Sequence, residues 1–473
     1  MTMSGEMKRI GNEAIYDARP LGVGRMLILG VQHLFAMFGA TVLVPLLTGL
    51  SVSSTLLFAG VGTLLFHMIA KWKVPAFLGS SFAFLAGYAA IAPKGDPALL
   101  PYACFGVACA GLVYLLLAAA FRAFGASRVM RYFPPIVTGP IIIAIGLTLS
   151  QSAIENCSKD WFIALVAIVV VIACNIWGHG MVKIIPILLG VAGSYLAAVA
   201  IGAVDFSAIA ARPWFGFPVE YDRTVFAIFT NGRVNFDLLL SSVITIVPIA
   251  FAAMMEHIGD ISAISSTVGI NYIRDPGLHR TLTGDGLATT AASLFGAPAN
   301  TTYGENTGVL TLTKVYDPKI IRLTAVFAVL LSFCPKFAAA IESMPTATIG
   351  GISLILYGMI ASVGVRNIVE TNVDFSQSRN VIVAALILVL SIGINYSSAG
   401  ALNFTLGGIG IKFSGIATGS LVGILLNAVL PGKDYKFDDD VPNRTGVNLE
   451  IAQGKSLDWR ASDGVEGQDT VIS

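Results

Sequence analysis

Apolar residues gather in long runs that follow one another along most of the chain, separated by short polar stretches. Each run approaches the roughly 20 residues that a helix needs to cross the hydrocarbon layer of a bilayer. The pattern therefore predicts an all-α polytopic membrane protein with about fourteen transmembrane spans. These runs lie at 26–48, 52–70, 75–93, 99–121, 134–154, 161–178, 182–204, 237–259, 279–296, 298–315, 320–341, 345–363, 379–396 and 413–431.

The composition agrees with a chain dissolved in lipid. Of the 473 residues, 55% are hydrophobic and 12% are charged, and the mean hydropathy is +0.78. Soluble domains carry about 25% charged residues, so the lipid bilayer is the expected surrounding. A net charge of +1 argues against a nucleic-acid partner, which would call for a basic excess. The five cysteines show no metal-ligand spacing, and we expect no metal and no cofactor.

The placement of Lys and Arg predicts the orientation of the chain. Cytoplasmic loops of membrane proteins are enriched in these residues. Most of the 29 lie in loops after even-numbered spans or in the two termini. Both termini are therefore predicted to be cytoplasmic, and the protein to lie in the plasma (inner) membrane. Loops after odd-numbered spans hold only Lys94, Lys159, Arg212, Arg223, Arg233, Lys336 and Lys412.

The third and tenth runs contain similar segments. Residues 75–82 read Pro-Ala-Phe-Leu-Gly-Ser-Ser-Phe, and residues 298–305 read Pro-Ala-Asn-Thr-Thr-Tyr-Gly-Glu. The offset of 223 positions between them also relates His33 in the first run to Glu256 in the eighth. Proline and small, β-prone residues predict that both spans are broken by a short extended segment; the alternative is a simple proline kink.

A second pair of segments supports an internal repeat. Residues 134–139 and 345–350 both run from proline to glycine, 211 positions apart. Fourteen spans then divide into seven plus seven. Because seven is odd, the second copy starts on the opposite side of the membrane, so the repeat is inverted.

Acidic residues at membrane depth mark the candidate site. Glu256, Asp285 and Glu305 fall within predicted spans or breaks, and Asp260 falls at the edge of the eighth. A charge at the centre of the bilayer costs roughly 2.5–3.5 kcal/mol on insertion scales, so such residues usually have a function. The alternative is that they pair with a buried base, for which His33 is the main candidate.

The breaks supply the other half of the site. Half-helices that meet near the midplane present free backbone N–H groups to a ligand. Carboxylates accept hydrogen bonds from ring N–H groups, while Phe82 and Tyr303 offer flat faces for stacking. A planar neutral lactam such as uracil or xanthine fits these groups. A carboxyl group in an apolar site takes up a proton more readily than one in water, which makes the proton the expected coupling ion.

Two other classes of function remain in view. An anion exchanger or channel of the same inverted-repeat fold predicts a basic or neutral site between the breaks, where this chain has Glu305. A membrane enzyme could use Glu256 and Asp260 as paired carboxylates, since positions i and i+4 share one helix face. Because no metal ligands or nucleophile elbow accompany them, we expect that the protein is not an enzyme.

At these residues the sequence resembles the nucleobase–ascorbate transporter family over roughly residues 25–431, and its uracil permease branch in particular. The family signature is Gln or Glu, then Asn-x-Gly-x-x-x-x-Thr and Arg, Lys or Gly. It is matched in full from Glu305-Asn306 to Thr313-Lys314. Gln32-His33 is similar to the family's first-span pair. The segments 78–84, 274–280 and 300–305 resemble the uracil branch.

The resemblance implies an architecture of two bundles. Spans 1–4 and 8–11 would form a substrate-binding core, and spans 5–7 and 12–14 a gate that also forms a homodimer. The implied mechanism is proton symport by an elevator-like movement of core against gate. The corresponding predicted segments are an N-terminal cytoplasmic segment 1–24, core 25–125 and 237–342, gate 126–236 and 343–432, and a disordered cytoplasmic tail 433–473.

The resemblance also implies roles for single residues. Substrate would be bound by Glu256, Glu305, Phe82, Tyr303, Gly304 and Ser81. Proton coupling or support of the site would fall to Asp260, Asp285, His33, Gln32, Asn306 and Thr313. Asp260 and Asp285 depart from the uracil pattern towards the purine branch, so uracil is the expected substrate and xanthine or urate the alternative.

Overall fold

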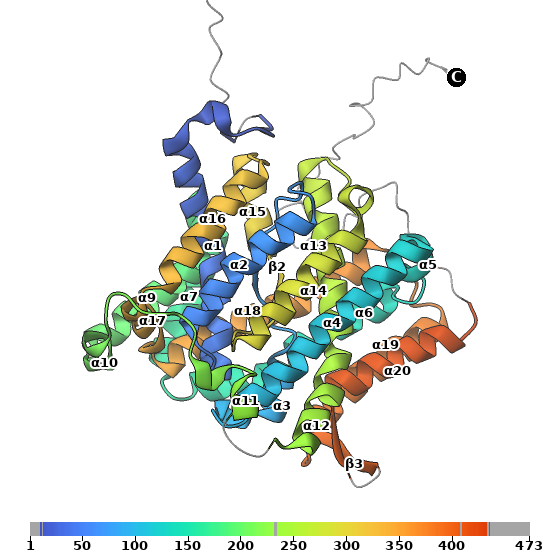
Figure 1. Ribbon diagram of the computed structural model, residues 1–473. Coiled ribbons are helices and arrows are strands. Elements are labelled where there is room, and N and C mark those ends of the chain that lie inside the picture. The colour runs from blue at the N-terminus through green and yellow to red at the C-terminus, as the bar shows by residue number, and fades with distance from the viewer. Residues whose placement is uncertain (1–9, 12, 231–233, 407–408, 433–434, 436–473) are drawn as a thin grey trace, which may run out of the picture.

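The computed structural model describes residues 10–11, 13–230, 234–406, 409–432 and 435, and within these the chain is mostly helical (Figure 1). The predicted tail 433–473 lies outside the described residues, apart from the single position 435. A helix, or a short strand followed by a helix, occupies each of the fourteen predicted apolar runs. The predicted all-α fold with broken third and tenth spans is confirmed.

The first seven runs correspond to the elements up to α9. The third run is the broken one, with β1 followed by α3, and α8 and α9 share the seventh. Their bounds are α1 Val23–Thr48, α2 Val52–Ile69, β1 Leu78–Ser80, α3 Leu85–Ile91, α4 Leu100–Phe124, α5 Ala126–Met130, α6 Pro135–Cys157, α7 Trp161–Trp177, α8 Met181–Ile184 and α9 Pro186–Ala200.

The second seven runs follow two short helices, α10 (Ser207–Ala211) and α11 (Ala227–Thr230). A hairpin of two strands, not predicted from the sequence, precedes the last helix. The bounds are α12 Phe236–Ile246, α13 Ala250–Val268, α14 Leu278–Leu294, β2 Asn300–Thr302, α15 Gly304–Thr313, α16 Pro318–Ser332, α17 Pro335–Glu342, α18 Thr346–Glu370, α19 Ser378–Asn395, β3 Ala401–Leu406, β4 Ile409–Ser414 and α20 Gly415–Val429.

Not every run is one straight helix. Among the described residues, seven helices are long and apolar enough to cross a membrane, or eight if the bent pair α16–α17 is one span. The bend in that pair is 86°. The predicted limit of the eighth run at residue 259 is wrong, because α12, a short turn at Pro248 and α13 continue to Val268. Asp260 therefore lies inside this span and not at its edge.

The helix contacts repeat between the two halves of the chain. Helix α2 of the first half packs against α16 of the second half. Helix α14, the counterpart of α2, packs in the same way against α4, the counterpart of α16. Likewise α7 packs against α9, as α19 packs against α20. Helices α6 and α18, which occupy equivalent places in the two halves, pack against each other. This exchange of partners is what a seven-plus-seven repeat requires.

Strands β1 and β2 form an antiparallel pair at the centre of the molecule, with Gly79 opposite Thr301. They come from the two segments that the 223-residue offset relates. Equivalent segments that run antiparallel are expected of an inverted repeat, whose halves are related by an axis in the membrane plane. All six residues of the pair are buried.

Two threonines satisfy the outer edges of this small sheet. Thr63 Oγ1 on α2 accepts a hydrogen bond from Leu78 N at 2.9 Å and donates to Leu78 O at 3.3 Å. Thr289 Oγ1 on α14 accepts from Asn300 N at 3.2 Å and donates to Asn300 O at 2.8 Å. Because extended backbone at membrane depth has no water to bond, each hydroxyl replaces a missing neighbouring strand.

Replacing Thr289 with valine should therefore destabilise the protein at nearly constant volume. The N–H and C=O of Asn300 would both lose a partner, and an unsatisfied buried polar group costs about 1–3 kcal/mol. We expect a lower thermal unfolding temperature in detergent. Thr55→Val is the matched control, because Thr55 Oγ1 bonds only Ser51 O, which also accepts from the Thr55 amide. An equal loss in both variants would contradict this account.

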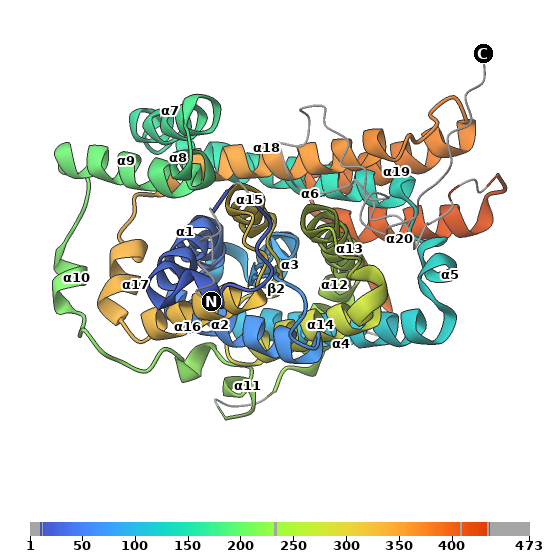
Figure 2. The same ribbon diagram turned by 90° about the horizontal axis from the view of Figure 1, so that it is seen from above.

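Seen from above, the helices separate into two groups (Figure 2). Helices α6, α7, α9, α18, α19 and α20 lie in one long layer, beside a bundle that contains α1–α4 and α12–α17. The layer is tightly packed at the crossing of α6 and α18. A Cβ atom on Gly364 would lie 2.6 Å from the carbonyl oxygen of Gly139, so the helices approach at a distance that only glycine allows.

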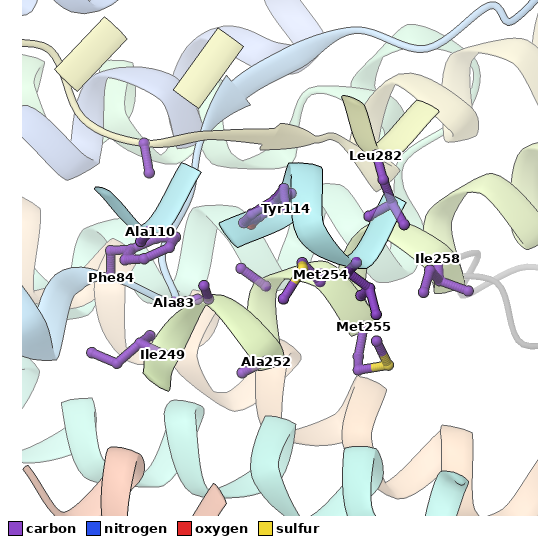
Figure 3. Packing of buried hydrophobic residues seen from close by; sticks show 14 of the residues in the cluster. Ala83, Phe84, Ala110, Tyr114, Ile249, Ala252, Met254, Met255, Ile258 and Leu282 are labelled. Atoms are coloured by element: carbon purple, nitrogen blue, oxygen red, sulfur yellow. The ribbon is translucent and has the colours of Figure 1, made fainter. Parts of the chain in front are cut away.

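The bundle has its own apolar core around α13. Figure 3 shows Met254 and Ile258 of this helix close to Tyr114 of α4 and Leu282 of α14. All four are buried and belong to one cluster. Helix α13 is thus held by apolar contacts on one face, which leaves its polar face to the site described next.

Candidate functional site

The centre of the bundle holds two glutamates on neighbouring helices. Glu256 lies on α13 and Glu305 in the first turn of α15, and these helices contact each other. Both side chains are partly exposed, unlike the other acids nearby. Their carboxyl groups are close enough for their charges to interact.

Open space lies on the same helix faces as these glutamates. A Cβ atom built on Gly259 of α13, or on Gly308 of α15, would meet no atom within 4 Å. Each glycine follows its glutamate by three positions, so glycine and glutamate share a helix face. Open space therefore adjoins the face of α13 that carries Glu256 and the face of α15 that carries Glu305.

Asp260 joins α13 to strand β2, which precedes α15. Its Oδ2 accepts a hydrogen bond from Thr302 Oγ1 at 2.7 Å, and its other oxygen has no partner among the described residues. The side chain is 2% exposed. Asp260 thus joins α13 to strand β2, directly ahead of the turn that carries Glu305.

Asp285 does not face the open space but pairs with a histidine. His257 Nδ1 lies 3.1 Å from Asp285 Oδ2, and both side chains are fully buried. The ring of Phe66 meets the His257 ring edge-on at 6.1 Å between centroids. Sequence reasoning missed His257 and offered His33 as the base for these acids; that assignment is wrong for Asp285. The available signal was a histidine directly after Glu256 in an apolar run.

His33 instead supports α15. Asn306 Nδ2 lies 3.2 Å from His33 Nδ1 and donates to the His33 carbonyl oxygen at 3.1 Å. Both residues are buried. The neighbouring Gln32 is partly exposed on α1, and its Oε1 is buried without a partner among the described residues. His33 and Asn306 thus join α1 to the helix that carries Glu305.

The third-span break contributes buried backbone and one aromatic ring. Ser81 N donates to Ala299 O at 2.8 Å, and Phe82 follows it, nearly buried. Tyr303 is buried, and its hydroxyl donates to Ser80 O at 3.0 Å. A Cβ atom on Gly79 would overlap the Tyr303 ring. Tyr303 therefore holds the two breaks together across the glycine.

Gly304 and Thr313 mark the two ends of α15. Gly304 opens the helix, whose first N–H groups have no partner within the helix and are suited to a ligand oxygen. Thr313 lies at the far end, where its hydroxyl bonds Val309 O at 2.8 Å. Thr313 thus lies away from the glutamates, and its hydroxyl closes the helix end.

The side chains of the site are suited to recognising a small polar molecule. Among the residues that the structure describes, no group of three or more His, Cys, Asp or Glu side chains could hold a metal ion. The two carboxyl groups can accept, and the first N–H groups of α15 can donate, hydrogen bonds to a small polar molecule in the adjoining open space.

Comparisons with known proteins identify the family of this chain. The family model described as "Permease family" (Xan_ur_permease) matches residues 24–400. The chain belongs to the nucleobase–ascorbate transporter family. A protein named uracil permease from Bacillus caldolyticus is 42% identical over 423 residues, which cover 87% of this chain and 93% of that protein. The uracil permease of Bacillus subtilis is 39% identical over 414 residues, covering 85% and 91%.

Solved structures share the fold of this transporter. The transmembrane domain of BicA, a cyanobacterium bicarbonate transporter, superposes with a TM-score of 0.59 at 14% identity. The match covers 80% of this chain and 97% of that one. The named permeases confirm that the chain is a membrane transporter of the uracil permease branch and not an enzyme, while the structural likeness shows the inverted-repeat fold alone.

Proposed function

We propose that this transporter imports uracil together with protons. The observation that carries the proposal is the pair Glu256 and Glu305, partly exposed beside the open space over Gly259 and Gly308. The ring N–H groups of uracil would donate to the two carboxylates. The first N–H groups of α15 would donate to a ring carbonyl oxygen. The names of the relatives support the same substrate.

Charge separates this proposal from its main alternatives. An inorganic anion, such as the bicarbonate named for the structural neighbour, would be repelled by two carboxylates. Xanthine or urate presents similar ring N–H and C=O groups on a larger frame, so these purines are the nearest competitors. The proposed coupling ion is the proton, which would neutralise carboxyl groups that must cross the membrane core.

The two groups of helices support a proposed elevator mechanism. The bundle that contains α13 and α15 would be the moving core, and the layer of α6, α7, α9 and α18–α20 the gate. The proposed location is the plasma (inner) membrane with both termini cytoplasmic. A homodimer formed through the gate is also proposed, and its mass in detergent can be measured by light scattering.

Uptake into proteoliposomes tests the proposal. With an inward proton gradient, we expect radiolabelled uracil to accumulate above its external concentration, because proton entry is downhill. A protonophore should remove the accumulation but not the equilibration of uracil. Unlabelled uracil, thymine, xanthine and hypoxanthine are then compared as competitors.

The competition decides between substrates. Strong competition by uracil and weak competition by xanthine supports the proposal. The reverse order would show a purine transporter with the same site. If neither base is bound, and bicarbonate exchange is found in its place, the chain is an anion transporter and the roles given to Glu256 and Glu305 are wrong.

A further inference from the structure

The segment before α1 is bonded to the rest of the protein, whereas the sequence predicted only a cytoplasmic segment there. Ile15 N donates to Lys314 O, and Tyr316 N donates to Ile15 O, both at 2.8 Å. These bonds form a parallel bridge between Ile15 and Val315, just beyond the end of α15. Figure 1 shows this N-terminal segment beside the ends of α15 and α16.

Further contacts join the same segment to three helices. Ala18 N donates to Asp317 Oδ2 at 2.8 Å, while Asp317 Oδ1 accepts from Lys319 N at the start of α16. The Tyr16 hydroxyl donates to Val268 O, the last residue of α13, at 2.8 Å. Ile15, Ala18 and Leu21 are buried in a small apolar cluster with Leu29, Val315 and Ile320.

We propose that residues 13–22 form a strap that positions Glu256 and Glu305 by holding together the far ends of the helices that carry them. The strap bonds the end of α13 through Tyr16 and the end of α15 through Ile15. A second tie, the bond between Asp260 and Thr302, joins the middle of α13 to the strand that leads into α15. Glu305 lies between the two ties, and Glu256 lies one turn of α13 beyond Asp260.

Open space beside both helices explains why the ties matter. Over Gly259 and Gly308 no atom would lie within 4 Å of an added Cβ, so no side chain packs against these faces of α13 and α15. Because helices are rigid over this length, fixing two points on each fixes their relative tilt. The strap therefore sets the distance between the two carboxyl groups without touching the substrate.

Point variants in the full-length protein test the strap. Ile15→Pro removes the N–H that bonds Lys314 O, because proline has no amide hydrogen. We expect faster hydrogen exchange across Gly308–Leu312, whose amides are bonded within α15, and a uracil dissociation constant raised about tenfold. Tyr16→Phe removes only the bond to Val268 and should raise the dissociation constant about threefold. Ala14→Pro is the control: Ala14 is exposed and its N–H bonds no other described residue.

The outcomes separate the strap from the proposed substrate. Exchange that rises only at residues 313–316, with uracil affinity within about twofold of wild type, would show a merely local contact and overturn the proposal. If Ile15→Pro does not fold, Tyr16→Phe decides by the same two measurements. If the wild type does not bind uracil, the proposed function fails, while hydrogen exchange over Gly308–Leu312 still decides the strap.

Discussion

Glu305→Ala should abolish uracil binding. The side chain lies in the first turn of α15, partly exposed beside the open space, and its carboxylate would accept a ring N–H bond. Losing a charged hydrogen-bond acceptor in a buried site costs about 1.5–3 kcal/mol or more, which corresponds to roughly a tenfold to hundredfold or greater loss of affinity. Isothermal titration of the purified protein with uracil measures this loss directly.

Conservative variants sharpen the interpretation. Glu305→Gln and Glu256→Gln keep the shape but replace one acceptor oxygen by a donor, so each should weaken binding less than alanine does. Glu155→Ala is the matched control, because Glu155 is exposed on α6 and bonds Gln151 in its own helix. Uracil affinity that survives Glu305→Ala unchanged would show that the site lies elsewhere.

Much of this arrangement could be predicted from the sequence because the bilayer constrains it strongly. Apolar runs of span length give the helices, and a proline beside small residues gives the breaks. The 223-residue offset placed the two breaks at equivalent positions in the two halves, and the structure pairs them as β1 and β2. Acids at membrane depth are rare enough that Glu256 and Glu305 could be selected without a structure.

What could not be predicted depends on side-chain direction and on contacts between distant residues. Position along the chain does not say whether His257 turns toward Glu305 or toward Asp285, since neighbouring residues on a helix point about 100° apart. The strap depends on pairing between Ile15 and Val315, which leaves no periodic pattern. The hydroxyls of Thr63 and Thr289 replace ladder bonds that only the packed sheet reveals.

Variants of the pair His257–Asp285 should show the second large effect, a loss of stability. The two side chains lie 3.1 Å apart, fully buried between α13 and α14. Removing one partner leaves the other polar group buried without compensation, which costs about 1–3 kcal/mol and more where that group is charged. We therefore expect His257→Leu and Asp285→Val each to lower the unfolding temperature strongly in detergent.

The double variant separates a structural role from a role in coupling. Replacing both members by apolar residues leaves no buried charge, so the double variant should recover most of the lost stability, and the thermodynamic cycle should be strongly non-additive. If the pair also carries the coupled proton, the stable double variant should bind uracil and equilibrate it across the vesicle membrane, but not accumulate it against a gradient. Full gradient-driven accumulation by that variant would assign the coupled proton to another acid, with Asp260 the next to test.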